Sequence, residues 1–236
     1  NNKMILKIVV LNNSGNVGKS TLCRSLLSPR IAGSKIINIE SINTDGSTSE
    51  KHRASDFIEI MKIIDSLPCV IVDVGSSNIE VFMNKLKSYD GAHEDFDYFI
   101  IPVTPQNKQQ QDTLVTINHL YDLNVPPEKI KIVFNQVDSS RNFDKQFAVI
   151  LESEAFKELG IVNYSMIPDT ELFRYLSDMG KDINTVLNDD RDFRTLMRET
   201  DDPDILELLS TERAIKRLAT GINKELDIAF NHLEII

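Results

Sequence analysis

The stretch MILKIVVLNNSGNVGKST, residues 4–21, contains the pattern that decides the fold of this chain. Residues 5–11 are mostly β-branched and apolar, and they form a run of the length that a buried strand needs. Residues 12–21 are small and polar and include two glycines, and residues 22–27 continue in a helical pattern. The order of strand, glycine-containing loop, Gly-Lys-Ser and helix predicts a loop that binds phosphate groups.

The spacing within this loop suits the chemistry of a nucleotide triphosphate. Phosphate charges are held by backbone N–H groups at a helix N-terminus, and Gly15 and Gly18 let the backbone approach them closely. Lys19 would place its charge on the β- and γ-phosphates, and the Ser20 hydroxyl would bind Mg²⁺. These residues predict a P-loop, with an ordinary strand-to-helix turn as the weaker alternative.

Asn13 is a departure from the usual Gly-x-x-x-x-Gly-Lys-Ser/Thr pattern, because it stands where that pattern has its first glycine. Asparagine tolerates left-handed backbone better than other non-glycine residues. We therefore expect the loop to close around Asn13 as it would around glycine.

Composition limits the classes of function. With 236 residues, 41% hydrophobic and 26% charged, the chain suits one globular domain with additions. The net charge of −10 makes direct DNA binding the weaker hypothesis. Two cysteines without metal-type spacing indicate reduced thiols in a cytoplasmic protein. We find no signal peptide and no apolar run that could span a membrane, and Met4 is a candidate natural start.

Apolar strand patterns alternate with helical ones along the first 180 residues, which predicts a doubly wound α/β fold. We expect a mostly parallel sheet of about six to eight strands flanked by helices. The predicted strands are 5–11, 35–40, 69–72, 98–103, 130–134 and 161–167, and the predicted helices include 57–67 and 79–86.

The last part of the chain is predicted to be helical. We expect residues 1–180 to form the nucleotide-binding domain and residues 181–236 to form a helical extension packed on that domain. Residues 188–204 are dense in charge and are interpreted as solvated turns, and residues 206–230 suggest a long amphipathic helix. Its polar side mixes both charge signs, which favours packing on the sheet or on a second subunit over a membrane surface.

Ligands in such sheets gather at the carboxyl ends of the strands. Asp73 closes an apolar strand and would hold Mg²⁺ opposite Ser20, and Gly75 behind it suits a switch that senses the γ-phosphate. Glu40 and, less strongly, Asp45 would orient the attacking water. The polar residues at the predicted strand ends are 12–20, Glu40, Asp73, Thr104, Asn135 and Asp169.

The sequence resembles the ParA/MinD group of P-loop ATPases, and within it most closely the StbB-type plasmid-stability proteins. The resemblance covers most of the first 180 residues and is carried by VVLNNSGNVGKST, IINIES, VIVDVGSSN, YFIIPVTPQ, IVFNQVD and MIPDTEL. It implies an ATP-binding, Mg²⁺-dependent switch for plasmid segregation, stability or positioning, and for conjugation, acting with a DNA-binding adaptor. The implied nucleotide-binding residues are Asn12, Asn13, Ser14, Gly15, Asn16, Val17, Gly18, Lys19, Ser20, Thr21, Asn135, Asp138, Pro168 and Asp169.

The resemblance also implies roles for single residues. Glu40 falls where that family has its catalytic aspartate, and Asp73 falls where it has the Mg²⁺-associated one. Ser14 falls where many members have a lysine that reaches across an ATP-bound homodimer, and Asn16 replaces a family glycine. The change at Ser14 predicts hydrolysis that is slow, partner-dependent or absent. It does not decide between a monomer and a homodimer. A nucleotide-binding scaffold without turnover is therefore the alternative to an ATPase.

The base of the nucleotide also has two interpretations. Asn135-Gln136-Val137-Asp138 is similar to the Asn-Lys-x-Asp element of GTPases, in which the aspartate binds guanine. Gln136 replaces the lysine of that element, and Asp138 could instead begin a polar loop, so ATP is favoured over GTP. A small-molecule kinase or synthetase is a further alternative, for which the sequence offers no obvious acceptor pocket.

Overall fold

The computed structural model describes residues 3–40, 51–53 and 56–236 of the 236-residue chain. Its centre is a seven-stranded sheet in the order β3-β2-β4-β1-β5-β6-β7, in which every described pair of neighbours is parallel. The predicted α/β fold with a mostly parallel sheet is therefore confirmed. The strands are β1 (Leu6–Val10), β2 (Lys35–Ile39), β3 (Lys51–His52), β4 (Cys69–Val74), β5 (Tyr98–Val103), β6 (Ile130–Val137) and β7 (Ser165–Pro168).

The central strands are apolar because helices cover both of their faces. All six residues of β4 are buried, which explains why its sequence is a nearly continuous apolar run, interrupted only by Asp73 near its end. The helices of one face share a hydrophobic core with Val9, Val72 and Phe99. They are α2 (Phe57–Ser66), α3 (Ile79–Ser88), α4 (Asn107–Asp122), α5 (Phe143–Gln146), α6 (Ala148–Leu151) and α7 (Glu154–Lys157).

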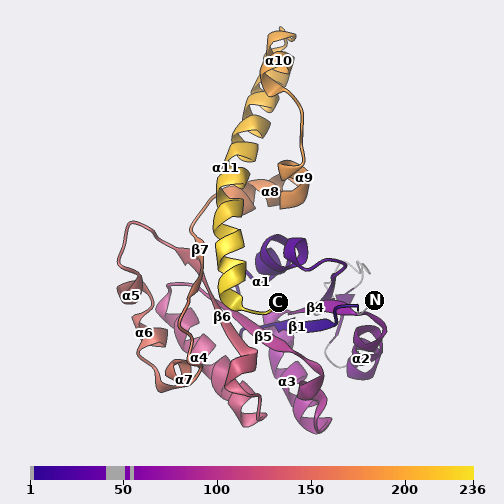
Figure 1. Ribbon diagram of the computed structural model, residues 1–236, viewed down its shortest axis with the longest axis vertical. Helices are drawn as coiled ribbons and strands as arrows, with labels where there is room; N and C mark the ends of the chain where they lie inside the picture. Colours follow the sequence, from indigo (N-terminus) through magenta and orange to yellow (C-terminus); the bar gives the residue numbers. More distant parts are fainter. Residues whose placement is uncertain (1–2, 41–50, 54–55) are drawn as a thin grey trace.

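The other face is covered by the segment that follows the predicted P-loop and by helices from the end of the chain (Figure 1). The first segment starts as α1 (Lys19–Thr21) and continues as a π-helical stretch, η1 (Leu22–Leu27), and a short 3₁₀ turn, η2 (Ser28–Arg30). The later helices on this face are α8 (Leu172–Met179), α9 (Ile183–Leu187) and α11 (Pro203–Leu233), whereas α10 (Phe193–Arg198) packs beside α11 away from the sheet (Figure 1).

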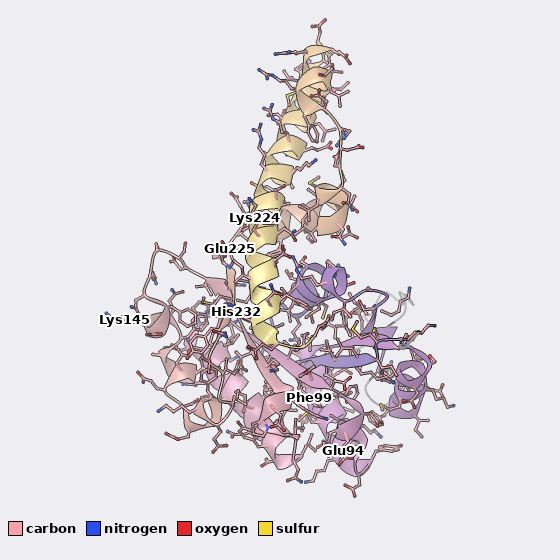
Figure 2. The ribbon with its side chains drawn as sticks, viewed as in Figure 1. Glu94, Phe99, Lys145, Lys224, Glu225 and His232 are labelled. Atoms are coloured by element: carbon pink, nitrogen blue, oxygen red, sulfur yellow. The ribbon has the colours of Figure 1, made fainter. Side chains whose placement is uncertain are left out.

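Helix α11 joins the sheet to a projecting part of the molecule. Near its C-terminal end, Leu226 and Ala229 are buried, and the Ala229 carbonyl accepts a 2.7 Å hydrogen bond from Ser165 Oγ of β7. His232, labelled near the sheet in Figure 2, places Nδ1 2.9 Å from the carbonyl oxygen of Tyr164. The N-terminal half of α11 points away from the sheet and carries α10 beside it (Figure 1).

Two predictions near the end of the chain need correction. The strand predicted at 161–167 is present as β7, but it begins only at Ser165, where pairing with β6 starts opposite Val133, and Val162 is 87% exposed. The interpretation of 188–204 as solvated turns missed α10, which starts after Asp192, whose carboxylate accepts a hydrogen bond from the Thr195 N–H. Within the described residues, no helix is both long and apolar enough to cross a membrane.

Candidate functional site

Asn12 fixes the start of the predicted P-loop to the sheet and to α4. Its buried side chain donates hydrogen bonds of 2.8 Å to the Pro102 carbonyl of β5 and to Thr113 Oγ1 of α4. Its Oδ1 accepts a 2.9 Å hydrogen bond from the N–H of Ser14. Because all these partners are buried or backbone groups, Asn12 fixes the loop to β5 and α4 rather than facing a ligand.

Asn13 is held by the same helix. Its N–H donates a 3.0 Å hydrogen bond to Thr116 Oγ1, which lies 3.2 Å from Asn13 Oδ1. Thr113 and Thr116 are one helical turn apart on α4 and are both buried. Neither threonine was predicted from the sequence, although two hydroxyls on the apolar face of an amphipathic helix are a usable signal.

The left-handed positions of the loop are Asn16, with φ 58°, and Gly18, with φ 89°. Asn13 is not among the residues with positive φ, so the reason given for tolerating asparagine there was wrong. The argument applies instead to Asn16, which stands where the resembled family has glycine. Asparagine is one of the few residues that adopt this conformation at small cost.

Asn135 lies against the loop from the end of β6. Its Nδ2 donates a 3.0 Å hydrogen bond to the carbonyl oxygen of Val17 and lies 2.3 Å from where a Cβ would stand on Gly18. The close approach and the positive φ both require glycine at position 18. Asn135, proposed to contact the base, thus also supports the P-loop.

Ser20, Lys19 and Asp73 form the polar centre of the site. Ser20 Oγ donates a 2.9 Å hydrogen bond to Asp73 Oδ2 at the end of β4. The buried Lys19 ammonium donates a 3.0 Å hydrogen bond to the carbonyl oxygen of Ser14, which is itself buried. The loop thereby holds a positive charge close to the helix N-terminus, where phosphate oxygens bind.

Burial shifts both charged groups of this centre toward their neutral forms. Desolvation raises the pKa of Asp73, and the hydrogen bond from Ser20 and the charge of Lys19 oppose that shift only in part. Desolvation likewise lowers the pKa of Lys19 against the attraction of Asp73. A cation bound at Asp73 and an anion bound at Lys19 would each stabilise the charged form of the group beside it.

The proposed catalytic and switch residues lie next to each other. The Gly75 N–H donates a 2.8 Å hydrogen bond to the Ile39 carbonyl, which joins the ends of β4 and β2. A Cβ on Gly75 would stand 3.0 Å from that carbonyl oxygen and 3.4 Å from Glu40 Cγ. The Glu40 charge also contributes to the raised pKa of Asp73, so the two carboxylates share one region. Asp45 lies outside the described residues.

The residues proposed to hold the base come from the loops after β6 and β7. The Asp169 N–H donates a 2.9 Å hydrogen bond to the Val137 carbonyl, so Pro168 and Asp169 lie beside the C-terminal end of β6. Asp138 is held by its own loop: its Oδ1 accepts hydrogen bonds from Ser140 N–H at 3.0 Å and Ser140 Oγ at 2.6 Å. These bonds lower the pKa of Asp138.

The remaining predicted residues surround this centre. Val17 is fully buried and anchors the loop in the core, whereas Gly15 is exposed, with its Cβ position 3.5 Å from Ser76 Oγ. Thr104 is buried and bonded to Gln109 on the first turn of α4. A cavity of about 610 Å³ between the α1–η1 segment and α8–α9 is lined in part by Ser20, Thr21 and Arg24.

Comparisons with known proteins place this geometry in a structural class. No model of a known protein family matches the sequence, and no curated protein matches it. MinD in the MinC:MinD cell division complex of Aquifex aeolicus is similar, with 13% identity over 78% of this chain and 89% of its own, and a TM-score of 0.51. An aspartate-to-alanine variant of Cyanothece McdA in complex with ATP has 14% identity over 93% of this chain and 98% of its own, and a TM-score of 0.51. The chain therefore has the fold of the P-loop proteins MinD and McdA.

Proposed function

We propose that this chain is a nucleotide-operated switch that binds ATP and Mg²⁺ at residues 12–21 and acts in plasmid stability, segregation or positioning. The observation that carries the proposal is the Ser20–Asp73 hydrogen bond of 2.9 Å beside the buried Lys19. A serine hydroxyl, a strand-end carboxylate and a lysine in this arrangement are the groups that a P-loop uses for a Mg²⁺–triphosphate. The fold of MinD and of ATP-bound McdA supports the same interpretation.

The donor set suits Mg²⁺ in particular. Mg²⁺ prefers oxygen ligands and is usually held by one or two protein groups, with phosphate oxygens and water completing its shell. Ser20 Oγ and Asp73 Oδ2 offer two such oxygens. No group of three or more His, Cys, Asp or Glu side chains in the described part of the chain is placed to hold a metal ion alone. The ion would therefore bind together with the nucleotide, and it would supply positive charge to the phosphates.

ATP is favoured over GTP because the guanine-binding interpretation needs the Asp138 carboxylate to be available to the base. That carboxylate instead accepts two hydrogen bonds from Ser140 and lies 3.4 Å from the Arg141 guanidinium. Guanine would have to compete with these partners for the carboxylate oxygens. The bound ATP of McdA points in the same direction.

Calorimetric titration of ATP, ADP, GTP and GDP, with Mg²⁺ and with a chelator, tests the proposal. Lys19→Ala should abolish nucleotide binding, because the phosphates lose a buried cation and the rest of the loop cannot replace it. Lys62→Ala is the matched control, since Lys62 is an exposed lysine on α2 that pairs with Glu59. Unchanged ATP and GTP affinity in Lys19→Ala would disprove nucleotide binding at this loop.

A scaffold that binds nucleotide without turnover is the second candidate function. Ser14 is uncharged and buried, and its carbonyl oxygen accepts the hydrogen bond of the Lys19 ammonium, so position 14 offers no cation to a second subunit. Phosphate release, measured with DNA and partner protein present, separates the two candidates. Turnover that is lost in Glu40→Gln but kept in Glu80→Gln, an exposed change on α3, would establish hydrolysis and exclude the scaffold.

The adaptor, the role in conjugation and the cytoplasmic location belong to the same proposal. The first two rest on the sequence resemblance, and the location rests on the two cysteines without metal-type spacing. The net charge of −10 supports an adaptor that supplies the DNA contact. Gel-shift assays at physiological salt test this point, because DNA binding by the pure protein would make the adaptor unnecessary. Sedimentation with and without ATP tests for a homodimer.

A further inference from the structure

The part of the molecule that projects from the sheet, here called the arm, consists of residues 189–212 and includes α10 and the first part of α11 (Figure 1). The arm is held in shape by an ionic cluster at its base. Arg191 pairs with Asp189 at 2.7 Å and with Glu212, and Lys181 lies 3.9 Å from the same glutamate. The Arg191 guanidinium also stands 4.9 Å from the centre of the Phe193 ring, which is buried.

The end of the arm carries exposed apolar side chains. Leu209 is buried where α10 packs beside α11, but Ile205, Leu206 and Leu208 are 46%, 43% and 57% exposed. These three large side chains lie within two turns of one helix end. About half of each of these side chains remains in contact with solvent, and such an apolar cluster at the end of a projection suits contact with another molecule.

The same segment is strongly acidic. Five carboxylates fall between Glu199 and Glu207, and the nearest basic residues along the chain are Arg198 and Arg213. The structure describes all five and shows no ion pair for any of them, although Asp202 caps α11 through the N–H of Asp204 at 2.9 Å. They are Glu199, Asp201, Asp202, Asp204 and Glu207.

The charge decides which partner fits. Two copies of this tip would bring like charges together, and nucleic acids and anionic membranes would be repelled in the same way. A polypeptide segment with lysines or arginines around an apolar face would satisfy both the carboxylates and the exposed side chains. We propose that the tip of the arm, residues 199–208, is a docking site for a basic amphipathic segment of a partner protein.

A labelled helical peptide of leucine and lysine, about 18 residues long with all leucines on one face, is the probe, and fluorescence anisotropy with the full chain is the readout. The double variant Ile205→Gln and Leu208→Gln should weaken binding by about tenfold or more, because the apolar contact is lost while the helix is kept. The matched control is Ile228→Gln with Val115→Gln, two changes at comparably exposed apolar positions on α11 and α4.

A second pair of variants separates the effect of the charge at the tip of the arm from the effect of the net charge of the chain. Neutralising Glu199, Asp201, Asp204 and Glu207 should weaken binding and flatten its salt dependence. Neutralising Glu128, Asp144, Glu152 and Glu158, which are exposed and lie elsewhere, removes the same charge and should change the affinity much less. Asp202, which caps the N-terminus of α11, is left unchanged in both variants.

The docking site stands apart from the proposed nucleotide switch, since peptide binding should persist in Lys19→Ala even if nucleotide binding is lost. A photo-crosslinking version of the peptide should attach within residues 199–208. The proposal is overturned if crosslinks map elsewhere or if both charge variants lose affinity equally. It is also overturned if a leucine–glutamate peptide binds as well, or if sedimentation shows self-association that Ile205→Gln abolishes.

Discussion

Asn135 Nδ2 lies 2.3 Å from the position that a Cβ would take on Gly18, although the two residues are far apart along the chain. Gly18 also has a φ of 89°, which side-chain-bearing residues rarely adopt. The P-loop backbone is therefore fixed twice at this point, by its own conformation and by a side chain from β6. Any substitution that adds a Cβ has to disturb one of them.

Gly18→Ala should destabilise the fold by more than left-handed strain alone. The backbone strain costs about 1–2 kcal/mol, and displacing Asn135 adds about 1–3 kcal/mol. Gly33→Ala is the control, because Gly33 has a φ of 73° but nothing within 4 Å of its Cβ position. Urea unfolding of both variants measures the difference. Equal losses in the two would show that the contact with Asn135 contributes nothing.

Asp73→Asn should remove the Mg²⁺-dependent part of nucleotide affinity while the chain stays folded. An asparagine oxygen can still accept the hydrogen bond from Ser20, but a neutral amide is a much weaker ligand for Mg²⁺ than a carboxylate. Calorimetry with Mg²⁺ should then give an ATP affinity close to that of the wild type with a chelator. Asp65→Asn, an exposed change in an ion pair with Lys7, should keep the full Mg²⁺ effect.

The same residue predicts a pH dependence of stability in the absence of nucleotide. Because burial raises the pKa of Asp73 above its ordinary value of 3.8, the folded state favours the protonated carboxyl. This contribution to stability is present below the ordinary value and is lost as the pH rises through the folded-state pKa. Urea midpoints measured from pH 4 to pH 7 should therefore rise for Asp73→Asn relative to the wild type. Parallel curves for the two proteins would contradict this.

Local patterns predicted most of the sheet and the P-loop, because hydrophobic periodicity and turn-forming residues can be recognised within short segments of sequence. Five of the six predicted strands lie where β1, β2, β4, β5 and β6 lie, the sixth overlaps β7, and the Ser20 hydroxyl is hydrogen-bonded to Asp73. The contacts from Thr113, Thr116 and Asn135 to the loop were not predictable in detail, since they depend on how distant elements pack. Helix α10 was missed because its few apolar residues lie within a segment dominated by charge.

The junction between η2 and α11 is another long-range feature, and it gives a stability prediction. The largely buried Arg30 guanidinium donates to the carbonyl oxygens of Ser25 and Leu26, to Asn223 Oδ1 at 2.7 Å, and to Asp227 at 2.9–3.0 Å. Arg30→Ala should cost about 2–3 kcal/mol in urea unfolding, because several charge-assisted hydrogen bonds are lost together.

Asp227→Asn is the comparison for that prediction. The Asp227 side chain is 61% exposed, so its ion pair with Arg30 should contribute less than about 1 kcal/mol. A small loss for Arg30→Ala, equal to that of Asp227→Asn, would show that the two segments are not held together by the guanidinium. A large loss for both would show that the exposed ion pair is the main contact.

The base of the arm should loosen in acid before the sheet does. Hydrogen bonds from Arg191 lower the pKa of Asp189 from its ordinary value of 3.8 to about 2. The stabilisation is therefore complete above the ordinary value and is lost as the pH falls toward the folded-state value. In amide NMR spectra recorded from pH 5 to pH 2, signals of α10 should shift first, while signals of α4 report on the sheet. In Asp189→Asn, the α10 signals at pH 5 should already lie where the wild-type signals lie in acid, because this variant lacks the carboxylate that pairs with Arg191. Simultaneous loss of the α10 and α4 signals would show that the arm has no separate acid transition.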